Sequence, residues 1–183
     1  MNSLESLMRE HRVIERAVNL LEEVALRLHR EEAVDVKTLT LLLRFFKEFT
    51  DKCHHGKEER VLFPFLESKG VPREGGPIGV MFLEHDIGRR LIKALDENLK
   101  YIDVDPEARR DIVDNALSYV KLLREHIFKE DNILFKIASE LMSVDEDKRL
   151  VEEFEEIEVN TIGSGLHEQL IKLLDEVEEL LRR

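Results

Sequence analysis

Apolar residues recur at alternating steps of three and four along most of this chain. At its start the series runs through Leu4, Leu7, His11, Ile14, Val18, Leu21, Ala25 and Leu28. This spacing is typical of an amphipathic helix that buries one face, because 3.6 residues make one helical turn. The series therefore predicts a helix that ends near Leu28, with Asn2 or Ser3 as its N-cap.

Three further series of this kind predict long helices over about residues 35–68, 78–102 and 106–141. Pro64 lies inside the second of them, and its missing N–H is expected to kink or end that helix. The segment SKGVPREGGP, at residues 68–77, is the clearest loop, because Gly and Pro punctuate it.

Two shorter, acidic amphipathic helices are predicted at about residues 145–158 and 165–182. The apolar stripe of the second one runs through Leu166, Leu170, Leu173 or Leu174, Val177 and Leu181. A stable protein buries such a stripe, so we expect these helices to pack on the rest of the chain or on a second subunit of a homodimer.

The connections between the long helices are short, which favours antiparallel neighbours. The sequence thus predicts an all-α fold with two parts. Residues 1–142 form an antiparallel up-down four-helix bundle, and residues 143–183 form a C-terminal helical extension.

The bundle shows an internal repeat. Residues 54–63 read HHGKEERVLF and residues 126–135 read HIFKEDNILF, an offset of 72 residues; residues 10–16 read EHRVIER and residues 84–90 read EHDIGRR, an offset of 74 residues. The two offsets agree within a loop adjustment, so the bundle is predicted to be a duplicated helical hairpin.

The repeated polar residues fall on the faces that should be buried. His11 and His85 sit in the middle of otherwise aliphatic series, and His54 and His126 lie on the core faces of their helices. Two glutamates, Glu58 and Glu130, follow His54 and His126 by four residues, which stacks each carboxylate about one turn from an imidazole. Two buried carboxylates without a cation would cost several kcal/mol each, and a metal removes that cost.

The ligand chemistry indicates which metal would bind. Four neutral imidazoles and two carboxylates carry a charge of −2, which suits two divalent cations. Imidazole and carboxylate without a repeated thiolate fit iron or manganese better than a structural zinc site. The simplest arrangement uses Glu58 and Glu130 as bridges with two histidines per metal, and it leaves positions for a bridging solvent oxygen and a small ligand.

These four motifs resemble those of a known protein family. The segments EHRVIER, HHGKEERVLFP, EHDIGR and HIFKEDNILF are similar to those of the hemerythrin-like, or HHE cation-binding, family, and the similarity covers residues 1–142. The resemblance implies a four-helix bundle with a non-haem di-iron centre, which an oxo or hydroxo bridge can link and in which manganese or zinc can substitute. It makes His11, His54, His85 and His126 terminal ligands and Glu58 and Glu130 bridges.

One departure from the family pattern is informative. Oxygen-carrying hemerythrins place two histidines one turn apart on the third helix, whereas here Met81 precedes His85 by four residues and Arg89 follows it by four. The sequence therefore resembles the subgroup that includes iron-sulfur-cluster repair proteins more than the oxygen carriers.

Several neighbouring residues are open to more than one interpretation. His55 and Glu59 keep the spacing of His54 and Glu58, but His55 shares its face with Asp51 and Lys52 and is expected at the polar edge; whether His55 or Glu59 contributes to the site stays open. Glu10 and Glu84 adjoin expected ligands and either orient them or are solvated. Gly88, one turn past His85, either opens a ligand pocket or permits close helix packing. Tyr119 and Thr50 lie on inner stripes as candidate hydrogen-bond donors.

Composition and charge exclude several classes of partner. The chain has 183 residues, a net charge of −12 and no basic stripe, which argues against nucleic acid and anionic membranes as partners. No apolar run approaches membrane-spanning length, and the start of the chain is unlike a signal peptide. The single cysteine, Cys53, fits a reducing compartment, so a cytoplasmic location is expected.

Together with the buried donor set, the resemblance to the hemerythrin-like family implies a di-iron protein that binds or senses dioxygen, nitric oxide or peroxide. The alternative is a di-iron enzyme, or an iron donor, that acts in peroxide removal or iron-sulfur cluster repair. Whether the chain is an enzyme stays open.

Overall fold

The computed structural model describes residues 2–161, 163 and 165–183, and every regular element in this part of the chain is helical. In chain order the elements are α1 (Asn2–His29), α2 (Val36–Phe45), η1 (Phe46–His55), η2 (Glu58–Leu62), α3 (Phe63–Ser68), α4 (Pro77–Leu99), α5 (Pro106–Lys129), η3 (Glu130–Leu134), α6 (Phe135–Leu141), α7 (Val144–Thr161) and α8 (Leu166–Arg182). The three η elements are π-helical segments. The all-α prediction is confirmed for the described residues.

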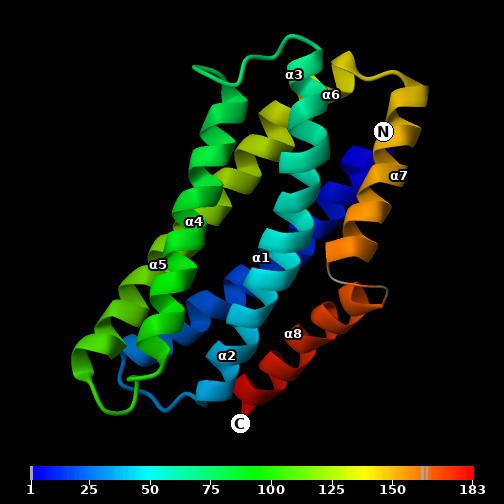
Figure 1. Cartoon of the computed structure of the whole chain (residues 1–183). Helices are drawn as coiled ribbons and strands as arrows, with labels where there is room; N and C mark the ends of the chain where they lie inside the picture. The colour runs from blue at the N-terminus through cyan, green and yellow to red at the C-terminus, as the bar shows by residue number, and fades with distance from the viewer. Residues whose placement is uncertain (1, 162, 164) are drawn as a thin grey trace.

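Figure 1 shows four long helical stretches side by side: α1, the stretch from α2 to α3, α4, and the stretch from α5 to α6. Successive stretches are joined at alternate ends of the molecule. The α5 helix packs against both α1 and α4, while α7 lies along α1 and α8 lies along α1 and α2.

Two of the helices have an aspartate N-cap, a residue whose carboxylate can accept hydrogen bonds from free backbone N–H groups. The Asp35 carboxylate accepts a hydrogen bond from the Lys37 backbone N–H at 2.9 Å before α2, and Asp105 accepts one from the Glu107 N–H at 2.9 Å before α5. Pro106 takes the first position of α5, where its missing N–H has no intrahelical partner to lose.

The first turn of α1 is held by a residue from α7. The Asp147 carboxylate accepts hydrogen bonds from the backbone N–H groups of Asn2 and Ser3 at 2.9 and 3.0 Å and from the Ser3 hydroxyl at 2.5 Å. Asn2 and Ser3 therefore lie inside the helix, and the expectation that one of them is the N-cap is wrong. A carboxylate suits this place because free N–H groups and the positive end of the helix dipole both favour an anion.

The helical stretch runs past Pro64 and ends at Ser68, so Pro64 does not end it. The residue before it, Phe63, closes a π-helical turn by donating its N–H to the Glu58 carbonyl, five residues back. Pro64 then falls in the first turn of α3, where a proline is tolerated much as at the start of a helix.

The apolar core forms two clusters with a polar layer between them. On α1, Leu7 belongs to one cluster and Ile14 to the other, and His11 lies between them. On α4, Met81 and Ile92 flank His85 in the same way. The fold thus holds the predicted ligands in the middle of the bundle, where burial makes unpartnered charge costly.

The apolar stripe of α8 packs within this chain. Leu170, Leu174, Val177 and Leu181 are buried in the same cluster as residues of α1 and α2, and Leu166 and Leu173 pack against it partly exposed. In the described part of the chain no helix combines the length and the apolar character that crossing a membrane requires.

Candidate metal centre

Five histidines and two glutamates meet in the polar layer between the apolar clusters. They are His11 on α1, His54 and His55 at the end of η1, Glu58 at the start of η2, His85 on α4, His126 on α5 and Glu130 at the start of η3. All seven are at most 5% exposed. The structure therefore brings together all six residues that the sequence predicts as ligands, and it adds His55.

The ligand atoms fall into two groups, within each of which they lie within 4.8 Å of one another. One group, here called the three-histidine group, consists of His55, Glu58, His85 and His126. The other, the two-histidine group, consists of His11, His54, Glu58 and Glu130. Each group offers enough nitrogen and oxygen donors for one divalent cation.

Both glutamates lie between the two groups. Glu58 places one carboxylate oxygen 3.4 Å from Nε2 of His54 and the other 3.5 Å from Nε2 of His85. Glu130 places one oxygen 3.1 Å from Nε2 of His11 and the other 3.3 Å from Nε2 of His126. Each carboxylate is thus placed as a bridge between two metal ions would be.

The polar atoms at the centre of this cluster lack hydrogen bonds. Among the described residues, both oxygens of Glu58, both oxygens of Glu130 and Nε2 of His11 are buried with no hydrogen-bond partner. Burial, reinforced by the charge of Glu130, raises the pKa of Glu58 well above its usual range. Unsatisfied buried carboxylates cost several kcal/mol, and cations among them would supply the missing interactions. The donor set therefore fits a metal centre.

The histidines are oriented from the outside by carboxylates. The Nδ1 atoms and their partners are His11 with Asp131 (2.6 Å), His54 with Glu10 (2.8 Å), His55 with Asp51 (3.4 Å), His85 with Glu59 (2.7 Å) and His126 with Glu84 (2.9 Å). Such a partner fixes the ring and leaves Nε2 free to bind a metal, as in carboxylate–histidine–metal triads.

These orienting carboxylates follow the internal repeat. Glu10 and Glu84, which precede His11 and His85 in the sequence, bond not to these neighbours but to His54 and His126. Glu59 and Asp131, which follow Glu58 and Glu130 in the sequence, bond to the histidines of the other half of the repeat, His85 and His11. Glu10 and Glu84 are thus orienting residues, and Glu59 contributes to the site in the same way.

Two lysines at matching positions of the repeat hold the orienting carboxylates Glu10 and Glu84. The Lys57 ammonium lies 2.5 Å from Glu10, and the Lys129 ammonium pairs with Glu84. The shared sequence HxxKE therefore contains a predicted ligand, the cation that holds an orienting carboxylate, and a carboxylate placed between the two groups.

His55 corrects the expectation that it lies at the polar edge. It is 5% exposed, and its ring stacks on that of His85 with centroids 3.8 Å apart. The face that His55 shares with Asp51 packs against α4, where Arg89 pairs with Asp51 and His85 stacks on His55, so this polar face is buried. The matching position in the second half of the repeat is Ile127, so His55 makes the two donor groups unequal.

The protonation states of the rings also differ. Burial lowers the pKa of His54 to about 4 and lowers the pKa values of His55 and His85 below their usual range, which keeps these rings neutral. Burial acts in the same direction on His126, but the charge of Glu130, 3.3 Å away, and the hydrogen bond to Glu84 outweigh it and raise its pKa to about 9. A metal ion would take the place of that proton.

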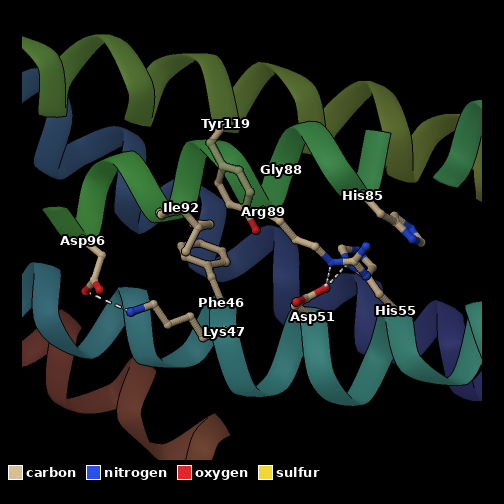
Figure 2. A pocket seen from close by; sticks show the side chains of 11 residues that line it. Phe46, Lys47, Asp51, His55, His85, Gly88, Arg89, Ile92, Asp96 and Tyr119 are labelled. Carbon is tan, nitrogen blue, oxygen red and sulfur yellow. Dashed lines mark hydrogen bonds and ion pairs between the residues drawn. The ribbon is translucent and has the colours of Figure 1, made fainter. Parts of the chain in front are cut away.

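A pocket of about 190 Å³ reaches this cluster from the surface. It lies between η1, α4 and α5, and Figure 2 shows His55 and His85 at one end of it. Gly88 and Tyr119 both line the pocket, and a Cβ atom at Gly88 would lie 3.4 Å from Cε2 of Tyr119, so Gly88 serves both packing and the pocket wall. The Thr50 hydroxyl is buried and has no partner among the described residues.

Comparisons with known proteins agree with this geometry. The chain is 25% identical over 178 residues to an uncharacterized protein of Mycobacterium tuberculosis, covering 97% of this chain and 69% of that protein. It is 30% identical over 112 residues to the iron-sulfur cluster repair protein YtfE of Escherichia coli O157:H7, covering 60% of this chain and half of that protein. It is 39% identical over 85 residues to YtfE of Dickeya chrysanthemi, covering 45% of this chain and 38% of that protein.

The family model for the hemerythrin HHE cation-binding domain matches residues 2–138, which contain all seven donor residues. This chain therefore belongs to the hemerythrin HHE cation-binding family.

Proposed function

We propose that the protein holds a dinuclear non-haem iron centre and uses it to bind or sense a small ligand such as dioxygen, nitric oxide or peroxide. The observation that carries the proposal is the pair of donor groups that share buried carboxylates. A single metal would leave half of these donors unpartnered in the core, whereas two metals would use them all.

Within this proposal each residue has a role that its position supports. His55, His85 and His126 hold one iron, His11 and His54 hold the other, and Glu58 and Glu130 bridge the two. A di-iron centre supplies one- and two-electron redox chemistry and coordination positions for a small ligand. The protein orients the rings through the five carboxylates at Nδ1 and excludes bulk water by burying all seven donors.

We also propose how the helices divide into a bundle and an extension. Residues 1–142 would form an antiparallel up-down four-helix bundle built from a duplicated hairpin, and residues 143–183 would form an extension. Two observations support this: the repeat extends to the orienting carboxylates, and the long stretches are joined at alternate ends (Figure 1). A homodimer and a cytoplasmic location stay predictions.

The similarity to YtfE favours a second candidate function. Those relatives are called iron-sulfur cluster repair proteins, so this chain would act as a di-iron enzyme or an iron donor in cluster repair or peroxide removal. The matches span half or less of those relatives, and the activity of the whole relative is a hypothesis for this chain.

Spectroscopy of anaerobically purified protein tests the proposal and separates the two candidates. A binding protein should develop a charge-transfer band once, on addition of nitric oxide or air, and the band should then be stable. An enzyme should consume peroxide through many turnovers, and an iron donor should lose iron to an added apo iron-sulfur protein. Protein that, after incubation with ferrous iron, develops no such band on addition of air or nitric oxide would contradict both.

A further inference from the structure

The C-terminal helices α7 and α8 contact an orienting carboxylate of the two-histidine group. Both helices lie along α1, and both also contact η1 (Figure 1). Glu158 on α7 and His167 on α8 reach the ion pair that Glu10 forms with Lys57. Because Glu10 orients His54, these two side chains lie one contact away from a residue that orients a predicted ligand.

Glu10 uses its two carboxylate oxygens for different partners. Oε2 lies 2.8 Å from Nδ1 of His54. Oε1 lies 2.5 Å from the Lys57 ammonium and 3.6 Å from Nε2 of His167. A carboxylate is a rigid plane, so contacts that hold Oε1 also fix the direction of Oε2. The groups around Oε1 therefore decide how Glu10 meets the His54 ring.

His167 places a polar atom on the Oε1 side. Its Nε2 atom is buried and has no hydrogen-bond partner among the described residues. The ring packs against that of Phe49, with centroids 4.8 Å apart. The neighbouring carboxylate favours the form of the ring that carries a proton on Nε2. At 3.6 Å the contact with Glu10 is longer than a hydrogen bond, so it acts through charge and dipole.

Glu158 holds Lys57 from α7. The Lys57 ammonium lies 3.0 Å from Glu158 and 2.5 Å from Glu10, so it sits between the two carboxylates. Lys57 is buried, and a buried ammonium needs such partners. A continuous series of contacts therefore runs from Glu158 through Lys57 and Glu10 to His54.

The second half of the repeat lacks these partners. Its matching carboxylate, Glu84, pairs with His126 and Lys129, and in the described part of the chain no residue of α7 or α8 forms an ion pair with Glu84 or Lys129. The side chains of Glu10 and Lys57 are 6% and 3% exposed, against 14% and 31% for Glu84 and Lys129. The C-terminal helices thus distinguish the two halves of an otherwise repeated arrangement.

From these observations we infer that the C-terminal helices contribute to the metal centre: His167 and Glu158 are positioning residues that hold Glu10, and through it His54, at the two-histidine group. The inference rests on the proposed function and deepens it. Both residues lie beyond the part of the chain that the family model matches, residues 2–138.

The contacts at Oε1 also set the strength of the contact at Oε2. A donor or cation at Oε1 draws negative charge away from Oε2. When that partner is lost, Oε2 becomes a stronger acceptor for Nδ1–H of His54, and Nε2 of His54 becomes more basic toward a metal. The effect should be confined to the metal position that His54 holds.

Matched variants of His167 separate this role from packing. His167→Met keeps an apolar side chain against Phe49 but has no N–H group. His167→Gln places an amide nitrogen about where Nε2 lies and is the conservative rescue. Gln169→Met, at an exposed position on the same helix, is the control. Glu158→Gln removes the charge that α7 presents to Lys57 and is a second variant should His167→Met not fold.

Histidine 15N NMR of zinc-loaded and of metal-free protein tests the positioning without redox chemistry. We expect the Nδ1 signal of His54 to shift in His167→Met, to return toward its natural position in His167→Gln and to stay in place in Gln169→Met. The Nδ1 signal of His126 should not change, because its carboxylate has no ion pair with the C-terminal helices. An unchanged His54 signal in His167→Met, or in Glu158→Gln if the former does not fold, would overturn the inference. Equal shifts of the His54 and His126 signals would overturn it too.

Mössbauer spectra of 57Fe(II)-loaded variants at equal iron content then test the effect on the metal. We expect His167→Met to shift the quadrupole doublet of one iron more than that of the other, and His167→Gln to restore the natural spectrum. Equal shifts of both doublets, or no shift, would overturn the inference and leave the proposed function standing. Failure of the natural protein to bind iron would overturn the proposed function, and the NMR result would still decide whether the C-terminal helices position His54.

Discussion

The Nε2 atoms of His85 and His126 lie 3.1 Å apart, while the Nδ1 atom of each ring is held by a carboxylate. When each Nδ1–H donates a hydrogen bond to its carboxylate, Nε2 carries a lone pair, and the lone pairs of the two rings face each other. Both residues are 1% exposed, so bulk water does not separate them. The two lone pairs repel each other. A proton on Nε2 of His126, or a cation bound by both Nε2 atoms, removes this repulsion.

This relationship predicts that metal stabilises the fold. A ligand that binds only the folded state at 100 times its Kd adds about 2.7 kcal/mol to the free energy of unfolding. Differential scanning calorimetry should show a higher unfolding temperature for iron- or zinc-loaded protein than for chelator-treated protein. His29→Ala, which changes an exposed histidine at the end of α1, should respond to metal like the natural protein. Equal unfolding temperatures with and without metal would speak against the site.

His55→Ala should lower the metal content by about one ion per chain. The substitution removes one of three histidines from the three-histidine group and none from the two-histidine group. Elemental analysis after dialysis would check this, with His29→Ala as the control. Unchanged metal content would show that His55 is a buried packing residue and not a ligand.

Lys57→Met should destabilise the protein more than the matched substitution Lys129→Met. Lys57 is 2% exposed and lies 2.5 Å from Glu10 and 3.0 Å from Glu158, so its loss leaves the buried Glu10 without its ammonium. Breaking a buried ion pair in this way costs about 3–5 kcal/mol. The Lys129 side chain is 31% exposed, and water can replace it. Urea unfolding of both variants measures the difference, and equal costs would contradict the buried role of Lys57.

The contact between Asp147 and Ser3 predicts a dependence of stability on pH. Burial alone would raise the pKa of Asp147, but its hydrogen bonds with Ser3 and Asn2 outweigh burial and lower it. A lowered pKa stabilises the folded state above the ordinary value of about 3.9, and this contribution is lost as pH falls through the folded-state pKa. Asp147→Asn should therefore cost about 1 kcal/mol at pH 7, and the difference from the natural protein should shrink as pH falls below about 4. Asp145→Asn, at a 93% exposed side chain, is the control; a pH-independent difference would contradict the role of the charge.

Much of this arrangement could be read from the sequence because helical periodicity and the repeat act together. The three-and-four spacing placed His11 and His85 inside, and the repeat paired His54 with His126 and Glu58 with Glu130. The helical limits agree closely as well, since these depend on local signals such as Pro106 and Gly165.

Other parts of the site and of the fold could not be predicted from α-helical spacing. His55 shares its helical face with the partly exposed Asp51, and only the folded structure shows that its ring stacks on that of His85 in the centre. The capping of α1 by Asp147 and the partners of Glu59 and Asp131 are tertiary contacts between distant segments. The sequence signal for Glu59 and Asp131 was the repeat itself, in which an acidic residue follows Glu58 and Glu130.

Mössbauer spectroscopy of protein reconstituted with 57Fe(II) tests the dinuclear centre most directly, alongside an iron count. Because His55 makes the two positions unequal, we expect about two irons per chain, a stoichiometry typical of bundle-core carboxylate sites. They should give two distinguishable quadrupole doublets of equal area. One iron per chain with a single doublet, or no bound iron, would contradict the dinuclear centre.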